Sequence, residues 1–306
     1  MLTKYEITKQ KILHKIDKII HNPFWALSQI PSYTIFWVIK SIARFLFKRL
    51  HLKYLTSKGD FFNIPIYIIS YNRFEYLRQM LEWLEKCGYK NITIIDNNSN
   101  YEPLLEFYKT CPYNVIRMKK NYGHFVFYKH IRFFWKRILS FYILTDPDLS
   151  LVEECPNDFV EQFVKIMVDY PSYYKVGFSL RIDDIPDDYY LKYEVLVCHT
   201  RFYEKIINNP KYAYKIYNAP IDTTFALNSP DLYSPFTGYK YKGLRTGTPY
   251  QLRHLPWYVT QRNSEVENYI KTARHDISNW DGSHSQEEVR ENLKLRIAEY
   301  ELKHKD

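Results

Sequence analysis

Short apolar runs alternate with amphipathic segments between residues 64 and 145, and this alternation constrains the fold more than any other feature of the sequence. Each run is continuously apolar, which is typical of strands that are covered on both faces. Alternating strands and helices in this order predict an α/β fold with a mixed, mainly parallel sheet flanked by helices. The predicted strands are residues 64–70, 91–96, 115–118 and 141–145, and the predicted helices are 74–87, 102–108 and 125–139. Asn72 is expected to cap the first of these helices.

The second half of the chain gives weaker signals. A helix is predicted over 157–170, a strand over 175–180, and a further strand over 221–227 that opens with Asp222. Residues 228–250 are rich in turn formers, and the charged tail after Ser264 is expected to be helical. We therefore expect a compact domain over 60–262 and a charged helical tail over 263–306.

Residues 1–59 are predicted to form a basic helical extension. Eleven Lys and Arg residues against three acidic ones in the first 60 residues account for most of the net charge of +9. Lys40, Arg44 and Lys48 share one helical face, which favours either an anionic membrane surface or packing on the domain or on a second subunit. These charges interrupt the apolar stretch, so a membrane-spanning helix is not expected.

Composition excludes several other classes of protein. The core domain is nearly neutral, so no nucleic-acid partner is expected. No secretory signal is recognisable and the four cysteines are widely spaced, which favours the reducing cytoplasm, either free or at the inner face of a membrane. The segment after the first strand, Ser70-Tyr71-Asn72-Arg73, lacks the glycines of a dinucleotide-binding turn, so hydride transfer is not expected.

Two carboxylates follow the fourth predicted strand directly, in Asp146-Pro147-Asp148. In open α/β sheets, ligands bind at the carboxyl ends of the strands. Carboxylate oxygens there suit a divalent cation, and a cation suits a diphosphate. An ordinary surface turn is the alternative, because Asp and Pro are both common turn residues.

Four segments, in this order, resemble nucleotide-sugar glycosyltransferases of the GT-A fold, close to family 2. They are PIYIISYNR at 65–73, IIDNNS at 94–99, NYGH at 121–124 and TDPD at 145–148. The resemblance extends over about residues 62–260 and implies a Rossmann-like GT-A domain. It also implies transfer of a sugar from a nucleotide diphosphate donor, typically UDP-linked, to a hydroxyl of a glycan or a lipid-linked glycan.

The resemblance also implies which residues of this chain bind the nucleotide-sugar donor. Tyr71 offers a ring for the base and Arg73 a cation for phosphate, although a surface charge at a helix start explains Arg73 equally well. Asp96 is either a hydrogen-bond acceptor for the nucleoside or a turn residue, and His124 is a less specific match. The expected nucleotide-sugar-binding residues are Ser70, Tyr71, Arg73, Asp96, Asn98, Asn121, Gly123, His124 and Asp146.

The resemblance also implies a metal site for Mn²⁺ or Mg²⁺. Asp148 is expected to bind the cation directly, Asp146 to reach the ribose or a metal-bound water, and His254 to complete the site. A core histidine is the alternative for His254. Trp257 and Tyr258 are expected to contact the acceptor sugar, with plain core packing as the alternative.

Asp222 is the candidate general base. An acid at the start of an apolar strand is expected to have a raised pKa, and a base there implies a single displacement with inversion. Its competitors are the acids of the loop Asp183, Asp184, Asp187 and Asp188. Two other functions stay open: a nucleotidyltransferase acting on sugar phosphates, and a non-catalytic binding module with a degenerate GT-A fold.

Overall fold

The computed structural model describes residues 32–230, 243–259, 263–273, 280 and 284–303. Its contacts divide the chain into two units, Met1–Phe47 and Lys48–Asp306. The boundaries expected at residues 59 and 262 stay predictions.

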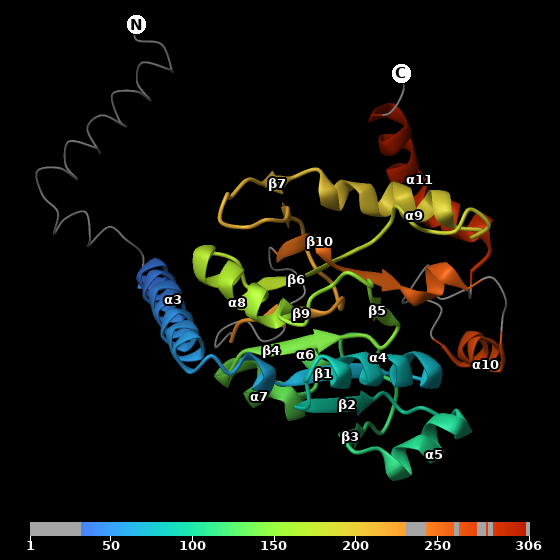
Figure 1. The fold of residues 1–306 in the computed structure, drawn as a ribbon, viewed down its shortest axis with the longest axis horizontal. Helices are drawn as coiled ribbons and strands as arrows, with labels where there is room; N and C mark the ends of the chain where they lie inside the picture. The colour runs from blue at the N-terminus through green and yellow to red at the C-terminus, as the bar shows by residue number, and fades with distance from the viewer. Residues whose placement is uncertain (1–31, 231–242, 260–262, 274–279, 281–283, 304–306) are drawn as a thin grey trace, which may run out of the picture. The chain divides into compact units, whose positions relative to one another are not determined.

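A ten-stranded mixed sheet forms the centre of the larger unit (Figure 1). The strand order is β3-β2-β1-β4-β9-β6-β10-β8-β7, and β5 pairs with β10 off this path. Strands β5, β8 and β9 run against the others, so the expected α/β fold with a mixed sheet is confirmed. The strands are β1 Ile66–Ser70, β2 Ile92–Asp96, β3 Asn114–Arg117, β4 Tyr142–Thr145, β5 Leu149–Leu151, β6 Lys175–Leu180, β7 Ile206–Ile207, β8 Ile216–Asn218, β9 Ala226–Asn228 and β10 Gly243–His254.

The described helices lie before, between and after these strands. Helix α4 packs with β5, while α8 packs with β6 and β9. Four short 3₁₀ segments are also described: η1 Phe61–Asn63, η2 Ile131–Phe133, η3 Thr200–Tyr203 and η5 Leu255–Tyr258. The α-helices are α3 Ser32–Lys58, α4 Phe74–Lys86, α5 Glu102–Thr110, α6 Val126–Lys129, α7 Phe134–Leu139, α8 Phe159–Asp169, α9 Lys192–His199, α10 Ser264–Thr272 and α11 Gln286–Lys303.

Two local expectations in the first half are wrong. The predicted helix 125–139 is broken at His130, whose backbone is extended and whose Nδ1 accepts a hydrogen bond from Arg132 N. Asn72 does not cap α4. It has a positive φ of 49°, and its Oδ1 accepts from the amides of Asn100 and Tyr101, so it joins the loops after β1 and β2 instead.

The region predicted to be turn-rich, 228–250, overlaps the longest strand described, β10. Gly247 and Pro249 produced the turn signal. Both lie where the pairing with β6 shifts between Thr246 and Gln251, so the irregularity accommodates the turn-forming residues without ending the strand. The predicted strand 221–227 is short in the structure, because β9 begins only at Ala226.

Lys48, at the end of the predicted basic face, points into the larger unit. Its residue is 1% exposed, and Nζ donates to the carbonyl oxygens of Pro171, at 2.9 Å, and Tyr173. Leu50 and Tyr54, by contrast, are exposed. Of the two alternatives for the basic face, packing on the domain therefore applies to Lys48, while the side chains of Lys40 and Arg44 lie outside the described residues. No helix in the described part of the chain is long and apolar enough to span a membrane.

Candidate functional site

Two cavities open at the carboxyl edge of the central strands, and three residues line both of them. The larger cavity has a volume of about 330 Å³ and the smaller about 140 Å³. Asp146, Asp148 and His254 belong to both linings and therefore form their common wall. The two acids follow β4 and the histidine ends β10, so the three come from opposite halves of the chain.

Sheet pairing brings these residues together. The short strand β5, which the sequence did not predict, pairs with β10 so that His254 lies opposite Leu149, the residue after Asp148. Asp148 O accepts a hydrogen bond from Leu255 N at 2.9 Å. Asp148 Oδ2 lies 3.5 Å from His254 Nε2. Asp146 is fixed from the other side, because its N donates to Thr223 O and its Oδ2 accepts from Thr223 Oγ1.

The pKa values of the two carboxyl groups are shifted in opposite directions. Burial, followed by the charge of Asp148, raises the pKa of Asp146 well above its usual value. Burial also opposes ionisation of Asp148, but His254 and then Arg73 outweigh it and lower its pKa. The charged form of Asp148 is therefore stabilised, whereas the charged form of Asp146 is disfavoured.

This wall has the chemistry of a divalent cation site. Carboxylate oxygens and an imidazole nitrogen suit Mn²⁺, and a cation would offset the repulsion between the two acids. His254 Nδ1 is buried and has no hydrogen-bond partner among the described residues, so a nitrogen of this ring is unsatisfied within that part of the chain. No three His, Cys, Asp or Glu side chains of the described residues converge closely enough to hold a metal as they stand. The donor types fit the cation, with Asp148 and His254 as the pair in contact.

The smaller cavity collects most of the residues expected to bind a nucleotide sugar. Tyr71 and Arg73 are covered by α10: Tyr71 OH donates to Thr272 O at 2.8 Å, and the Arg73 guanidinium carbon lies 3.5 Å from the centre of the Tyr269 ring. Arg73 is 4% exposed, so the surface-charge alternative is wrong. The residues of the expected nucleotide-sugar set in this lining are Tyr71, Arg73, Asn121, Gly123, His124 and Asp146.

Asn97, rather than the predicted Asn98, lines the smaller cavity. Its Nδ2 donates to Asn121 Oδ1 at 2.9 Å and to Gly123 O at 3.0 Å, while its Oδ1 accepts from Tyr122 N. Gly123 has a φ of 71°, a conformation that favours glycine. Asn98 is exposed. Side chains alternate between the two faces of a strand, so choosing between Asn97 and Asn98 requires knowing that the pairing of β2 ends at Asp96. The sequence does not give that residue.

Ser70 and Asp96 end adjacent strands in register but line neither cavity. Both are buried. Asp96 accepts hydrogen bonds from Ser99 N and from the Tyr108 hydroxyl, and its Oδ2 lies 3.2 Å from Arg117 Nε. The carboxylate of Asp96 therefore binds groups of the protein itself.

Asp222 lines the larger cavity, on a loop rather than a strand. The expected rise of its pKa is wrong. The surrounding protein opposes ionisation by desolvating the carboxyl, but the Arg245 charge and the hydrogen bonds from Thr224 N and Oγ1 outweigh this and hold the pKa at about 2. Lys175 fixes the same loop by donating to the carbonyl oxygens of Ile221 and Asp222.

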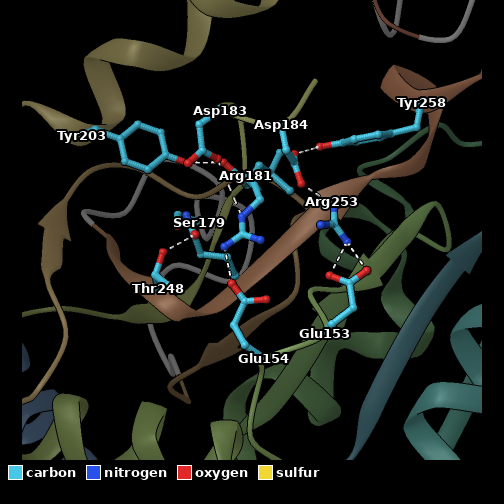
Figure 2. Close-up of polar contacts among 12 residues, drawn as sticks. Glu153, Glu154, Ser179, Arg181, Asp183, Asp184, Tyr203, Thr248, Arg253 and Tyr258 are labelled. Atoms are coloured by element: carbon cyan, nitrogen blue, oxygen red, sulfur yellow. Dashed lines mark hydrogen bonds and ion pairs between the residues drawn. The ribbon is translucent and has the colours of Figure 1, made fainter. Parts of the chain in front are cut away.

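The predicted acceptor residues separate in the structure. Trp257 is buried at the larger cavity, with its ring 4.8 Å from those of both His254 and His199. Tyr258 lies outside both linings and donates to Asp184, which also binds Arg253 (Figure 2). The remaining competitor acids lie outside the cavities too: Asp183 is 3.7 Å from Arg181, Asp187 pairs with Lys192, and Asp188 is exposed.

Sequence reasoning missed a group of basic residues in the larger cavity. Arg201, Arg245 and Arg296 line it together with His199. Burial and the Arg245 charge lower the pKa of His199 to about 3, so this ring is neutral at pH 7. These residues lie on α9, η3, β10 and α11 or beside them, and α9, η3 and β10 were not predicted.

Comparison with known proteins gives a remote structural likeness. No protein-family model matches the sequence, and no curated protein matches it significantly. Solved structures with a similar fold include the mannosyltransferase PcManGT from Pyrobaculum calidifontis in complex with GDP-Man and Mn²⁺. The TM-score is 0.41 at 12% identity, over 78% of this chain and 70% of that chain. Similarity at this level supports no conclusion about what this chain binds.

Proposed function

We propose that this protein is a metal-dependent glycosyltransferase that moves a sugar from a nucleoside diphosphate to a hydroxyl of a glycan or lipid-linked glycan. One observation carries the proposal: two acids and a histidine form the common wall of two cavities. A single displacement suits such an arrangement, because the acceptor hydroxyl must attack the sugar carbon of the donor from the side opposite the leaving diphosphate.

The smaller cavity is suited to the donor. Arg73 offers a buried guanidinium for phosphate, and Asn97 holds the Asn121–Gly123 turn so that backbone can lie close to a ligand. Tyr71 contributes an aromatic face. Asp148 and His254 would hold Mn²⁺ or Mg²⁺, which when bound stabilises the charge of a departing diphosphate.

The larger cavity is suited to the acceptor. Asp222 is the candidate base, because it lines this cavity apart from the two acids of the common wall. Its carboxyl is ionised at neutral pH and is able to accept a proton, although a pKa of about 2 makes it a weak base. An acceptor that drew the charge of Arg245 away from Asp222 would strengthen the base. Direct attack supported by Asp222 would invert the sugar carbon.

The test is incubation with UDP-, GDP- and dTDP-linked sugars, with and without Mn²⁺, followed by analysis of the released nucleotide. We expect metal-dependent release of nucleoside diphosphate, lost in Asp148→Ala and retained in Asp187→Ala, whose acid lies on the surface. A nucleotidyltransferase would instead release pyrophosphate from UTP, GTP or dTTP in the presence of a sugar 1-phosphate. Absence of nucleotide binding would leave a non-catalytic binding module.

A further inference from the structure

Three arginines from different elements converge on the larger cavity. Arg201 lies on η3, Arg245 on β10 and Arg296 on α11. Helices α9 and α11 pack side by side (Figure 1). The contact of Arg296 with Cys198 brings this arginine next to the end of α9. The cluster therefore depends on the tertiary fold, because its members are far apart in sequence.

Local contacts fix the guanidinium groups beside one another. Arg245 Nε and Nη2 both donate to Pro220 O, at 3.0 and 2.8 Å. The guanidinium carbons of Arg245 and Arg201 lie 4.5 and 4.8 Å from the centre of the same ring, that of Phe202. Arg296 Nη1 lies 3.7 Å from Cys198 Sγ. The aromatic ring and carbonyl hold the cations in place but do not neutralise them.

No carboxylate of the described residues forms an ion pair with any of these three arginines. Glu204 and Glu299 act on Arg201 only from a distance, and Asp222 acts in the same way on Arg245. Burial and then the charge of Arg296 lower the pKa of Arg201, which shows that the like charges are close enough to repel. Elsewhere arginines meet acids directly, as Arg253 does with Asp184 and Glu153 (Figure 2).

We propose that Arg201, Arg245 and Arg296 bind a phosphate or diphosphate group carried by the acceptor. The assignment to the acceptor rests on the proposed function, in which the donor occupies the smaller cavity. A carboxylate is satisfied by one guanidinium fork, whereas a phosphoryl group has three oxygens and up to two charges to share among several arginines. The donor diphosphate already has Arg73 and the common wall, so a second cationic cluster is best explained by a second anion.

Direct binding measurements test the site without knowledge of the natural acceptor. Inorganic phosphate, pyrophosphate and acetate are titrated calorimetrically into the metal-free protein at constant ionic strength. The double variant Arg201→Gln/Arg296→Gln is compared with Lys294→Gln, which removes a positive charge from an exposed residue of the same helix. We expect phosphate to bind more tightly than acetate, with the dissociation constant raised at least about tenfold in the double variant and unchanged in Lys294→Gln.

Two further sets of titrations complete the test. The first distinguishes a soluble from a lipid-linked phosphate, and the second distinguishes failure of the anion site from failure of the proposed function. Glucose 1-phosphate and a short polyprenyl phosphate in detergent report whether a soluble or a lipid-linked phosphate binds better. UDP and GDP with Mn²⁺ should bind the double variant as they bind the wild type. If nucleoside diphosphates bind neither protein but phosphate still requires the arginines, the proposed function fails while the anion site stands.

Three results would overturn the anion site or its assignment. Phosphate binding that is unchanged in the folded double variant removes the site, as does acetate binding as tight as that of phosphate. Equal loss of phosphate and nucleoside diphosphate binding would assign the arginines to the donor. If the double variant does not fold, the single variant Arg296→Gln replaces it in the titrations. Arg296 is exposed, and its one hydrogen bond within the described residues is to Cys198 Sγ.

Discussion

Asp148 Oδ2 and His254 Nε2 lie 3.5 Å apart, and this contact joins the end of β4 to the end of β10. Even changes one step removed from a metal ligand weaken metal binding by roughly tenfold or more. We therefore expect His254→Ala to raise the Mn²⁺ concentration required for half-maximal nucleoside diphosphate binding by at least about tenfold. Calorimetric titration measures this. His51→Ala, on α3 and outside both cavities, is the control, and an unchanged Mn²⁺ requirement in His254→Ala would contradict the metal assignment.

Asn97 and Asn98 are expected to differ sharply on substitution. Asn97→Ala removes three hydrogen bonds that hold residues 121–123, so unfolding should become easier by about 1–3 kcal/mol and nucleotide binding should weaken. Asn98 is exposed with a φ of 69°, so Asn98→Gly should stay within about 0.5 kcal/mol of the wild type. Urea unfolding decides between them, and similar losses in both variants would show that the inward-facing residue is misassigned.

The lowered pKa of Lys175 predicts that the free energy of unfolding rises with pH in mildly alkaline solution. Burial lowers its pKa from 10.5 to about 8. Between these two values the unfolded chain binds the proton and the folded chain does not, so the free energy of unfolding increases with pH by at most about 1.4 kcal/mol per unit. This rise should disappear in Lys175→Met and persist in Lys86→Met, an exposed residue of α4. Urea unfolding from about pH 7.5 to about pH 10 measures the slope, and parallel curves for all three proteins would refute the prediction.

Lys48 should contribute to stability rather than to membrane binding. Lys48→Met removes its hydrogen bonds to Pro171 O and Tyr173 O, with an expected cost of about 1–3 kcal/mol in urea unfolding. Arg49→Gln, at the next and exposed position, should change stability by less than about 0.5 kcal/mol. Binding of folded Lys48→Met to anionic vesicles should equal that of the wild type. Weaker vesicle binding would restore the membrane-facing interpretation.

The sequence located the first half of the fold because its signals are local. Strands β1, β2 and β4 are short, mainly apolar runs that end in polar residues, and the structure places each within two residues of its predicted limits. Asp146 and Asp148 follow β4 directly, so their position at the sheet edge depends only on that strand.

Long-range features escaped prediction for an equally physical reason. The strand signal of β10 is hidden by Gly247 and Pro249, and only the pairing with β6, which skips this stretch, shows how a strand accommodates them. The pKa of Asp222 depends on Arg245, which that strand carries. A charge brought from a remote segment leaves no trace in the residues around the acid.

The linings of the two cavities come largely from different parts of the sequence. Residues up to 148 supply most of the smaller one, whereas the arginines of the larger one all follow residue 200. Relatives that diverged only in their last hundred residues would thus keep the parts of the smaller cavity supplied by the loops after β1, β2, β3 and β4, while the wall around His254 and most of the larger cavity changed. Specificity for the ligand of the larger cavity would then evolve by exchange of the C-terminal segment.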